Sequence, residues 1–318
     1  MSSRTCPVVV TILSRNRTVF LTDTIESWLR QTRKPAKLVI LDNASEPDTV
    51  AAIEDFADRG VILDRCPSII GVAENFKRAR RHASEAWLIV AHDDDIYHPN
   101  YLELVDKVIS YTPYAPGVLV GTMLIDFTPT LEFGYSLRDA KLRRLDVAGL
   151  ARELYSGAKV NFGATVYRRD VFNRIDPDWA RYANLFDRPF LLACARDDGA
   201  ALVDRPVVKY RVHRGQDVRN AAAALPARYV CNLVRCYKGI LRPNGWLAPD
   251  LFARRSLFLL WDSVRREARG ISGAFRSVRG AGVLSADEWI WGVLFFPWYF
   301  VRYRAAAWIR SIQEKFAS

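Results

Sequence analysis

The first hundred residues alternate between short apolar runs and segments in which apolar side chains recur every three or four positions. The runs are rich in β-branched residues and have the length of strands that are buried on both faces of a sheet. The periodic segments between them predict amphipathic helices. We expect strands at residues 7–13, 37–41, 61–63 and 86–91. This alternation predicts an α/β, Rossmann-like, doubly wound sheet with right-handed connections.

The pattern changes after Pro99, where strands and helices no longer alternate. Residues 117–125, 160–167 and 207–211 predict further strands, whereas residues 185–196 predict a helix. The complete sheet is therefore expected to be mixed and to be flanked by helices.

The composition changes again near residues 221–226, and we place a domain boundary there. Residues 1–224 form the predicted α/β domain, and residues 225–318 form a helical extension that is rich in aromatic and basic side chains. The extension holds 15 Lys and Arg against 6 Asp and Glu, a net charge of +9 out of +11 for the whole chain. An anionic partner is therefore expected to meet the extension.

Tryptophan, tyrosine and arginine favour the headgroup level of a membrane, so we expect residues 225–318 to attach to an anionic membrane surface. The alternative is a helical lid or a dimer interface, which would bury the aromatics against the first domain or within a homo-oligomer. No run of about 18 apolar residues occurs, and a membrane-spanning helix is not expected. The N-terminus lacks the pattern of a signal peptide, and the five cysteines form no CxxC pair. We expect a cytoplasmic protein on the inner face of the cell membrane.

Three consecutive carboxylates, Asp93, Asp94 and Asp95, follow the fourth predicted strand. The carboxyl ends of strands in open α/β sheets are the places where ligands bind. Three neighbouring carboxylates repel one another unless a cation or a set of hydrogen-bond donors intervenes. Mg2+ or Mn2+ would supply the missing charge and could bridge a phosphate. The alternative is a solvated acidic turn that caps the helix after Pro99.

Five short segments occur in the order known from one enzyme family. They are residues 10–17 (VTILSRNR), residues 41–45 (LDNAS), Gly71 with Asn75, residues 92–99 (HDDDIYHP) and residues 210–213 (YRVH). With these segments, about the first 215 residues resemble the family two glycosyltransferases, which have the A-type nucleotide-sugar fold. The resemblance implies a metal-dependent, inverting enzyme of polysaccharide biosynthesis. Such an enzyme moves a sugar from a nucleoside diphosphate-sugar to a hydroxyl group of a lipid-linked or cell-surface glycan.

The resemblance assigns six residues to the nucleotide: Ser14, Asn16, Arg17, Asp42, Asn75 and Asp93. Ser14, Asn16 and Arg17 would line the nucleoside pocket, and Asp42 would bind the base or the ribose. The residues themselves leave alternatives, because Ser14 and Asn16 could shape a turn and Asp42 could cap the next helix. Glu74 stands where many relatives carry arginine, so a pyrophosphate contact beside Asn75 stays open.

The resemblance also makes the acidic turn a site for Mn2+ or Mg2+. Asp94 is the first choice as a metal ligand, and Asp95 and His213 complete the expected set, because neutral imidazole suits Mn2+. His213 could equally be a surface or packed histidine beside Arg211.

Asp187 is the expected catalytic base. The family places a carboxylate ahead of an apolar helix, commonly in a Glu-Asp pair, and Asp187 stands where that Asp would be. Phe186 replaces the Glu and Pro189 follows closely, so Asp187 could instead be the N-cap of a helix that begins at Pro189. Asp197 and Asp198 are weaker candidates on the same predicted helix.

The basic side chains within residues 77–81 lie on the polar side of an amphipathic helix, so we interpret them as a solvated face and do not expect nucleic acid as a partner. Two other functions stay open. A sugar nucleotidyltransferase would share the sheet and a carboxylate-bound Mg2+, but residues 14–17 lack the glycines that its phosphate loop needs. A catalytically silent, basic protein that binds membranes or nucleic acid is kept open by Phe186 and Glu74.

Overall fold

The structure is a computed structural model that describes residues 5–111, 115–126, 130–213, 226–244, 249–264 and 270–316. The chain divides into two compact units. The first comprises Met1–Pro177 and Phe190–Val212, and the second comprises Asp178–Pro189 and His213–Ser318. The boundary predicted between residues 224 and 225 lies outside the described residues and stays a prediction.

Four parallel strands form the first half of the sheet. They are β1 (Cys6–Ser14), β2 (Pro35–Asp42), β3 (Val61–Arg65) and β4 (Trp87–His92). β1 lies between β2 and β4, and β3 pairs with the outer side of β2. Each strand covers one of the four predicted apolar runs, except that Ala86 precedes β4, because burial on both faces of a parallel sheet requires such runs.

The second half makes the sheet mixed. Its strands are β5 (Ile96–Tyr97), β6 (Val118–Asp126), β7 (Leu142–Leu145), β8 (Val160–Arg168) and β9 (Ala200–Arg211). β8 runs antiparallel between β4 and β6, and β9 pairs in parallel with β6. The strand order is β3-β2-β1-β4-β8-β6-β9-β5, with β7 beside β9. The predicted mixed α/β fold is confirmed, although β5 and β7 were not expected, because so few residues leave no periodic pattern.

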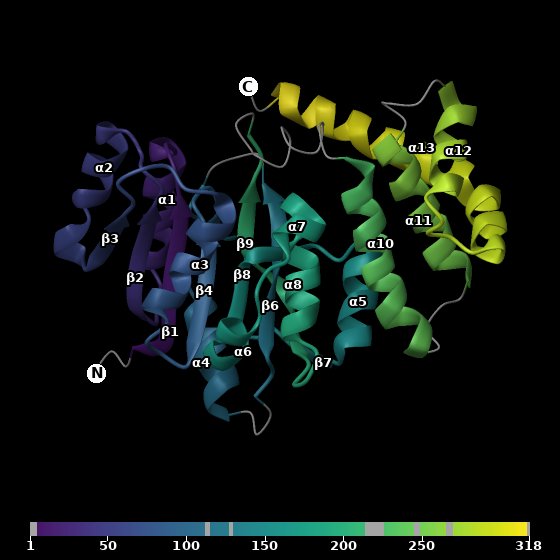
Figure 1. The fold of residues 1–318 in the computed structure, drawn as a ribbon. Coiled ribbons are helices and arrows are strands. Elements are labelled where there is room, and N and C mark those ends of the chain that lie inside the picture. Colours follow the sequence, from purple (N-terminus) through teal and green to yellow (C-terminus); the bar gives the residue numbers. More distant parts are fainter. Residues whose placement is uncertain are drawn as a thin grey trace. The chain divides into compact units, whose positions relative to one another are not determined.

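Helices flank the strands of the first unit (Figure 1). They are α1 (Thr18–Leu29), α2 (Pro47–Glu54), α3 (Val72–His82), α4 (Tyr101–Tyr111), α5 (Val147–Ser156) and α6 (Arg169–Arg174). One short 3-10 turn, η1 (Ala57–Arg59), precedes β3. Helix α8 (Asp187–Cys194) begins in the second unit and ends in the first.

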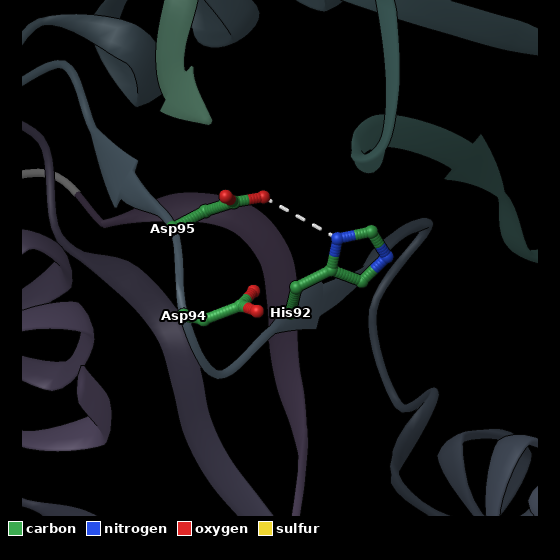
Figure 2. Close-up of side chains that lie close together, drawn as sticks. All are labelled: His92, Asp94 and Asp95. Atoms are coloured by element: carbon green, nitrogen blue, oxygen red, sulfur yellow. Dashed lines mark hydrogen bonds and ion pairs between the residues drawn. The ribbon is translucent and has the colours of Figure 1, made fainter. Parts of the chain in front are cut away.

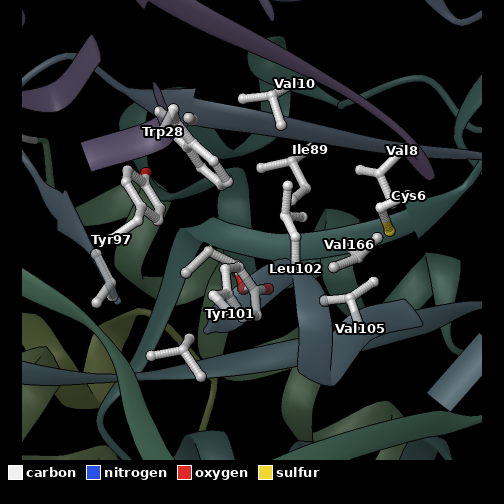
Figure 3. Packing of buried hydrophobic residues seen from close by; sticks show 14 of the residues in the cluster. Cys6, Val8, Val10, Trp28, Ile89, Tyr97, Tyr101, Leu102, Val105 and Val166 are labelled. Atoms are coloured by element: carbon white, nitrogen blue, oxygen red, sulfur yellow. Dashed lines mark hydrogen bonds between the residues drawn. The ribbon is translucent and has the colours of Figure 1, made fainter. Parts of the chain in front are cut away.

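The two faces of the sheet pack against different aromatic groups. On one face the Trp28 ring of α1 lies 4.2 Å from the Tyr97 ring and 6.3 Å from the Tyr101 ring, measured between centroids. Val10 and Ile89 belong to the same buried cluster (Figure 3). On the other face a second set of rings surrounds Phe76 of α3: Phe162, Tyr167, Phe172 and Phe190. These clusters fix the sheet between its helices and hold the carboxyl ends of the strands in place.

The second unit is helical. It contains α7 (Trp179–Tyr182), η2 (Ala183–Leu185), α10 (Ala227–Leu241), η3 (Arg242–Asn244), α11 (Pro249–Val264), α12 (Gly270–Gly280) and α13 (Ala286–Phe316). The helical extension expected for residues 225–318 is therefore confirmed. Within the described parts of the chain, none of the helices has both the length and the apolar character needed to cross a membrane.

Candidate active site

The carboxyl ends of β1, β2 and β4 meet at one edge of the sheet. Ser14, the last residue of β1, pairs with Asp42 of β2, and Leu13 pairs with His92 of β4. The three strands are parallel, so the turns that follow them lie at the same edge. Ser14, Asp42 and the acidic turn are thus brought together, as the sequence predicted, at the edge where open α/β sheets bind ligands.

The acidic turn is buried. Asp93, Asp94 and Asp95 are only 8%, 9% and 0% exposed. Asp95 is held by donors from distant strands: its carboxylate accepts hydrogen bonds from Asn161 Nδ2 at 2.9 Å and from the Arg211 backbone N–H at 3.3 Å. The interpretation of these residues as a solvated turn is therefore wrong, since a turn that caps a surface helix would expose its carboxylates.

Arg17, from the turn between β1 and α1, faces two of the three carboxylates. The Arg17 guanidinium lies 3.7 Å from Asp93 and 3.3 Å from Asp94. Burial and then the charge of Asp94 raise the pKa of Asp93 to about 7, and Arg17 only partly offsets this. Burial also raises the pKa of Asp95. The turn therefore binds protons unusually readily, which is the behaviour of a carboxylate cluster with too little positive charge around it.

The side chains of the turn fit a divalent cation. One ring nitrogen of His92 and one carboxylate oxygen each from Asp94 and Asp95 lie within 4.8 Å of one another, and the three side chains converge (Figure 2). Carboxylate oxygens suit Mg2+ and Mn2+, and an imidazole suits Mn2+. His92 Nδ1 also lies 3.3 Å from Asp95 Oδ2. Burial lowers the pKa of His92, but the hydrogen bond to Asp95 and the neighbouring carboxylates outweigh it and raise this pKa to about 9.

His92 was not assigned as a ligand from the sequence, although it directly precedes the three aspartates. Its position as the last residue of β4 was the available signal, because that position faces the same edge as the turn. His213, which was assigned, is the first residue of the second unit after β9, and its role as a ligand stays a prediction.

Asn16 shapes the turn between β1 and α1. It has a positive φ of 52°, which asparagine tolerates better than most residues. Its backbone N–H donates to Ser45 Oγ at 2.9 Å, and its Oδ1 accepts from the Glu46 N–H at 2.8 Å. The side chain thus ties the turn after β1 to the turn after β2, which supports the turn-shaping alternative. Its contact with a nucleoside stays a prediction.

Asp42 does not cap the following helix. Its carboxylate accepts from the Ser45 N–H at 3.1 Å and lies 3.5 Å from Arg65 Nε, whereas the N-cap position of α2 is Glu46, without a side-chain cap. Asp42 is fully buried at the carboxyl end of β2. Its contact with a base or a ribose stays a prediction.

Arg78 corrects the interpretation of residues 77–81 as a solvated face. It is 4% exposed, and its guanidinium donates at 2.9 Å both to the Asp42 backbone carbonyl and to Asn75 Oδ1. It also forms an ion pair of 2.6 Å with Asp64. The guanidinium thus donates hydrogen bonds to acceptors at the ends of β2 and β3. Arg78 is therefore buried beside Asp42 and Asn75, two of the candidate nucleotide residues. Arg81 of the same helix is exposed, as predicted.

Arg211 joins the acidic turn to α1, a role that was not predicted from its place in the late Tyr-Arg-x-His segment. Its guanidinium donates to the Asp94 backbone carbonyl, to Asp23 Oδ2 at 2.8 Å and to the Phe20 carbonyl at 2.6 Å. It therefore holds the peptide chain of the turn, while Asn161 and the Arg211 N–H hold the Asp95 side chain. The position of Arg211 at the end of a predicted strand was the only sequence signal for this role.

Comparison with known families identifies the family to which the chain belongs. The family model described as Glycosyl transferase family 2 matches residues 9–176, which is more than half of the chain. The chain belongs to glycosyl transferase family 2. It is a nucleotide-sugar glycosyltransferase, and the resemblance is confirmed; four of the five segments lie within the matched range, and residues 210–213 follow it.

Solved structures share the fold of this glycosyltransferase, whereas no curated protein matches its sequence. One is residues 1–349 of S. aureus TarS in complex with UDP-GlcNAc, at 12% identity and a TM-score of 0.57, covering 87% of this chain and 88% of that chain. Another is the mannosyltransferase PcManGT from Pyrobaculum calidifontis in complex with GDP-Man and Mn2+, at 13% identity and a TM-score of 0.52. That match covers 90% of this chain and 83% of the other. At these identities the likeness establishes the A-type glycosyltransferase fold.

The candidate bases of this glycosyltransferase lie in different places. Asp187 is half-buried in the first turn of α8, which begins two residues earlier than Pro189, so Asp187 is not an N-cap to a helix that begins there. It belongs to the second unit, and its role as the base stays a prediction. Asp197 and Asp198 follow the end of α8 in a turn, so their predicted place on the helix is wrong.

Asp198 lies near the amino end of β4, whereas the acidic turn follows the carboxyl end of that strand. It forms an ion pair of 2.6 Å with Arg168, and Arg168 pairs with Trp87, the first residue of β4. The acidic turn follows the last residue of the same strand. A six-residue strand spans roughly 17 to 20 Å, so Asp198 cannot serve a reaction at the acidic turn.

Proposed function

We propose that this family 2 glycosyltransferase is a metal-dependent, inverting enzyme that transfers a sugar from a nucleoside diphosphate-sugar to a hydroxyl group of a glycan. The observation that carries the proposal is the cluster of His92, Asp94 and Asp95, whose ligand atoms lie within 4.8 Å of one another in a buried turn. Two of the solved structures with this fold hold a UDP-sugar and a GDP-sugar, and one of them holds Mn2+, which supports this class of donor and cofactor.

Asp94, Asp95 and His92 would hold Mn2+ or Mg2+, with His213 as a further predicted ligand. When bound, the cation would stabilise the negative charge that develops on the departing diphosphate. Arg17 would orient the turn, since its guanidinium already contacts Asp93 and Asp94. The Asn161 and Arg211 donors keep the Asp95 carboxylate in one orientation. Such preorganisation lowers the cost of charge development during the reaction.

The nucleotide is proposed to bind along the same edge. Ser14, Asn16 and Arg17 would line the nucleoside pocket, with Asp42, Asn75 and Asp93 as further contacts. Support comes from the pairing of Ser14 with Asp42 and from Arg78, which contacts Asp42 and Asn75 together. The pocket would thereby hold the anomeric carbon of the sugar in a fixed position for attack.

Asp187 is proposed as the base that accepts the proton of the acceptor hydroxyl. As the hydroxyl oxygen attacks the anomeric carbon, the bond from that carbon to the diphosphate oxygen breaks, and the configuration inverts. A carboxylate in the first turn of a helix can serve this purpose when it lies within hydrogen-bond reach of the hydroxyl group. Its place in the family pattern, ahead of an apolar helix, supports the assignment.

We further propose a lipid-linked or cell-surface glycan as the acceptor, in polysaccharide biosynthesis, with the enzyme on the inner face of the cell membrane. The support is the charge of residues 225–318, which is +9, together with their aromatic content. A basic surface of this kind is attracted to anionic lipids.

The decisive experiment is a screen of common nucleoside diphosphate-sugars for hydrolysis, with the wild type and with Asp94→Ala. We expect turnover of the true donor to fall by about a thousandfold or more in the variant, because a ligand of the charge-stabilising cation is lost. Asp58→Ala serves as the matched control, since Asp58 is an exposed aspartate in η1 of the same unit.

Thermal shift with nucleoside diphosphates, with and without Mn2+, accompanies the screen. Retained folding of Asp94→Ala is checked by its melting temperature. No stabilisation by any nucleoside diphosphate, together with no hydrolysis by the wild type, would favour the catalytically silent alternative.

A further inference from the structure

Helix α13 is apolar on two sides. Its inner side packs within the second unit, where the Phe296 ring lies 5.0 Å from the Trp261 ring of α11 and 5.0 Å from the Phe275 ring of α12, measured between centroids. Phe300 lies 5.6 Å from Trp261, and Trp289 lies 6.0 Å from Phe275. These contacts account for one side of the helix and show where the unit has its own core.

The other side of α13 carries large apolar side chains that are exposed. We call this set the outer stripe: Ile290, Trp291, Leu294, Trp298 and Val301. Their exposed fractions are 59%, 41%, 63%, 52% and 66%. Ile290, Leu294, Trp298 and Val301 follow one another at intervals of four, four and three residues, which places them on one face of a helix. The positions of Trp289, Phe296 and Phe300 place those rings on the opposite face.

The sequence around the outer stripe is free of charge over more than three helical turns. No charged residue occurs from Trp289 to Val301, and Arg302 and Arg304 follow directly. Glu288, which precedes the segment, is 2% exposed and forms ion pairs of 2.8 Å with Lys238 and with Arg242. Its negative charge is thus compensated within the unit and does not oppose an anionic surface beside the stripe.

Exposed side chains of this number and kind are unusual on a soluble surface. Scattered single apolar residues need no explanation, but a continuous set on one helix indicates an interaction surface. Two of the five are tryptophans, whose rings favour the interface between lipid headgroups and acyl chains. Residues 225–318 carry a net charge of +9, and Arg276 and Arg279 of α12 are exposed, so the unit that presents the stripe is basic.

We propose that the outer stripe of α13 is the surface through which the enzyme binds an anionic lipid bilayer, with the helix lying in the plane of the interface. The apolar side chains would enter the boundary between headgroups and acyl chains, and the net positive charge of residues 225–318 would attract anionic headgroups. Charge favours this occupant over a second copy of the chain, because two copies of residues 225–318, each with a net charge of +9, repel each other, whereas an anionic bilayer attracts one. The inference gives a surface to the membrane location proposed above, and it does not depend on the donor chemistry.

The test uses the full chain with the double variant Leu294→Ser/Val301→Ser. The matched control is Val19→Ser/Ile62→Ser, which also removes two exposed apolar side chains, 78% and 43% exposed, but from the first unit. Each protein is sedimented with vesicles of phosphatidylcholine that contain phosphatidylglycerol, and with vesicles of phosphatidylcholine alone. We expect the stripe variant to bind the anionic vesicles about tenfold more weakly than the wild type, and the control to bind as the wild type does.

Two further readouts keep the result unambiguous. Trp291 and Trp298 remain in the stripe variant, so a shift of tryptophan emission to shorter wavelength on addition of anionic vesicles reports burial in the wild type and its loss in the variant. Equal melting temperatures show that the variant is folded. Added salt is expected to weaken wild-type binding, because the arginines contribute through screened charge.

The proposal is overturned if the stripe variant binds anionic vesicles as tightly as the wild type. It is also overturned if the wild type does not bind vesicles but forms a dimer that Leu294→Ser/Val301→Ser dissociates, since the stripe would then cover a second copy. Donor hydrolysis is measured without vesicles in parallel. Vesicle binding without hydrolysis of any donor would contradict the proposed function and leave this surface standing.

Discussion

The acidic turn after β4 and the outer stripe of α13 depart from the usual distribution of side chains in opposite directions. Asp93, Asp94 and Asp95 are carboxylates that are less than a tenth exposed, whereas the stripe holds apolar side chains that are 41% to 66% exposed. A buried charge costs free energy unless it is compensated, and exposed apolar area costs free energy unless it is covered. Each region is therefore the basis of one of the two proposals above, a cation at the acidic turn and an anionic bilayer at the outer stripe.

The two regions differ in how strictly their geometry is set. In the acidic turn, directional donors from other strands, Asn161 Nδ2 and the Arg211 N–H, hold the Asp95 carboxylate in one orientation. The outer stripe has only its helical spacing, because hydrophobic burial is proportional to area and has no direction. A site that binds a cation and a diphosphate needs the first kind of surface. A site that enters a fluid bilayer can use the second.

Among the tests of this comparison, the largest effect on stability should come from a substitution on the inner side of α13, compared with one on its outer side. Phe296→Ala removes a ring that packs on Trp261 and Phe275, and we expect it to lower the free energy of unfolding by about 3 kcal/mol. Leu294→Ala, on the outer stripe, should change it by less than about 0.5 kcal/mol. Denaturant titration of both variants checks this. Equal losses would show that the outer side is also packed, and the comparison with the acidic turn would fail.

A smaller effect is expected behind the nucleotide residues. Arg78→Met removes the donor that contacts the Asp42 carbonyl and Asn75 Oδ1, so we expect KM for the donor to rise about tenfold with little change in kcat. Arg81→Met is the control, because Arg81 is an exposed arginine of the same helix. Steady-state kinetics measure both constants. If Arg78→Met lowers only the melting temperature and leaves KM unchanged, Arg78 supports the fold without positioning the nucleotide residues.

The smallest effect concerns pH and the charge of the acidic turn. The pKa of Asp93 is raised to about 7, above its ordinary value of 3.8, so the folded protein holds a proton that the unfolded chain has lost between these values. Stability contributed by that proton is present below the unfolded pKa and is lost as pH rises through about 7. The cation-free protein should therefore lose a few degrees of melting temperature between mildly acidic and mildly basic pH.

Asp93→Asn tests the origin of this loss, because an amide resembles the neutral carboxyl group and does not ionise. The variant should melt higher than the wild type at basic pH and nearly equal to it at acidic pH. Added Mn2+ should stabilise the wild type more at basic than at acidic pH, because metal ligands must be deprotonated. Parallel melting curves for wild type and variant across this range would show that the turn carries no unmet negative charge.

Local patterns in the sequence were enough for most of the first half of the molecule. The runs that became β1, β2, β3 and β4 are short, apolar and rich in β-branched residues, and these properties act within a few residues of the chain. The position of the three aspartates after the last strand also followed, because a polar turn must come where a buried run ends. The family resemblance added the fold and the activity, which composition and spacing alone would have left open.

Only the tertiary structure decided which groups face the aspartates. Asn161 contacts Asp95 from 66 residues away, and the Arg211 N–H does so from 116 residues away. The helical pattern predicted Arg78 to be on the surface, but its acceptors lie at the ends of β2 and β3. Asp198 is near Asp187 in the sequence, but the length of β4 separates it from the acidic turn. The sequence by itself determined the elements and the ends of strands that carry polar groups, since short-range sterics and the period of apolar residues set these. The partners of each charge were decided by packing, because hydrogen bonds and burial depend on segments that no local pattern brings together.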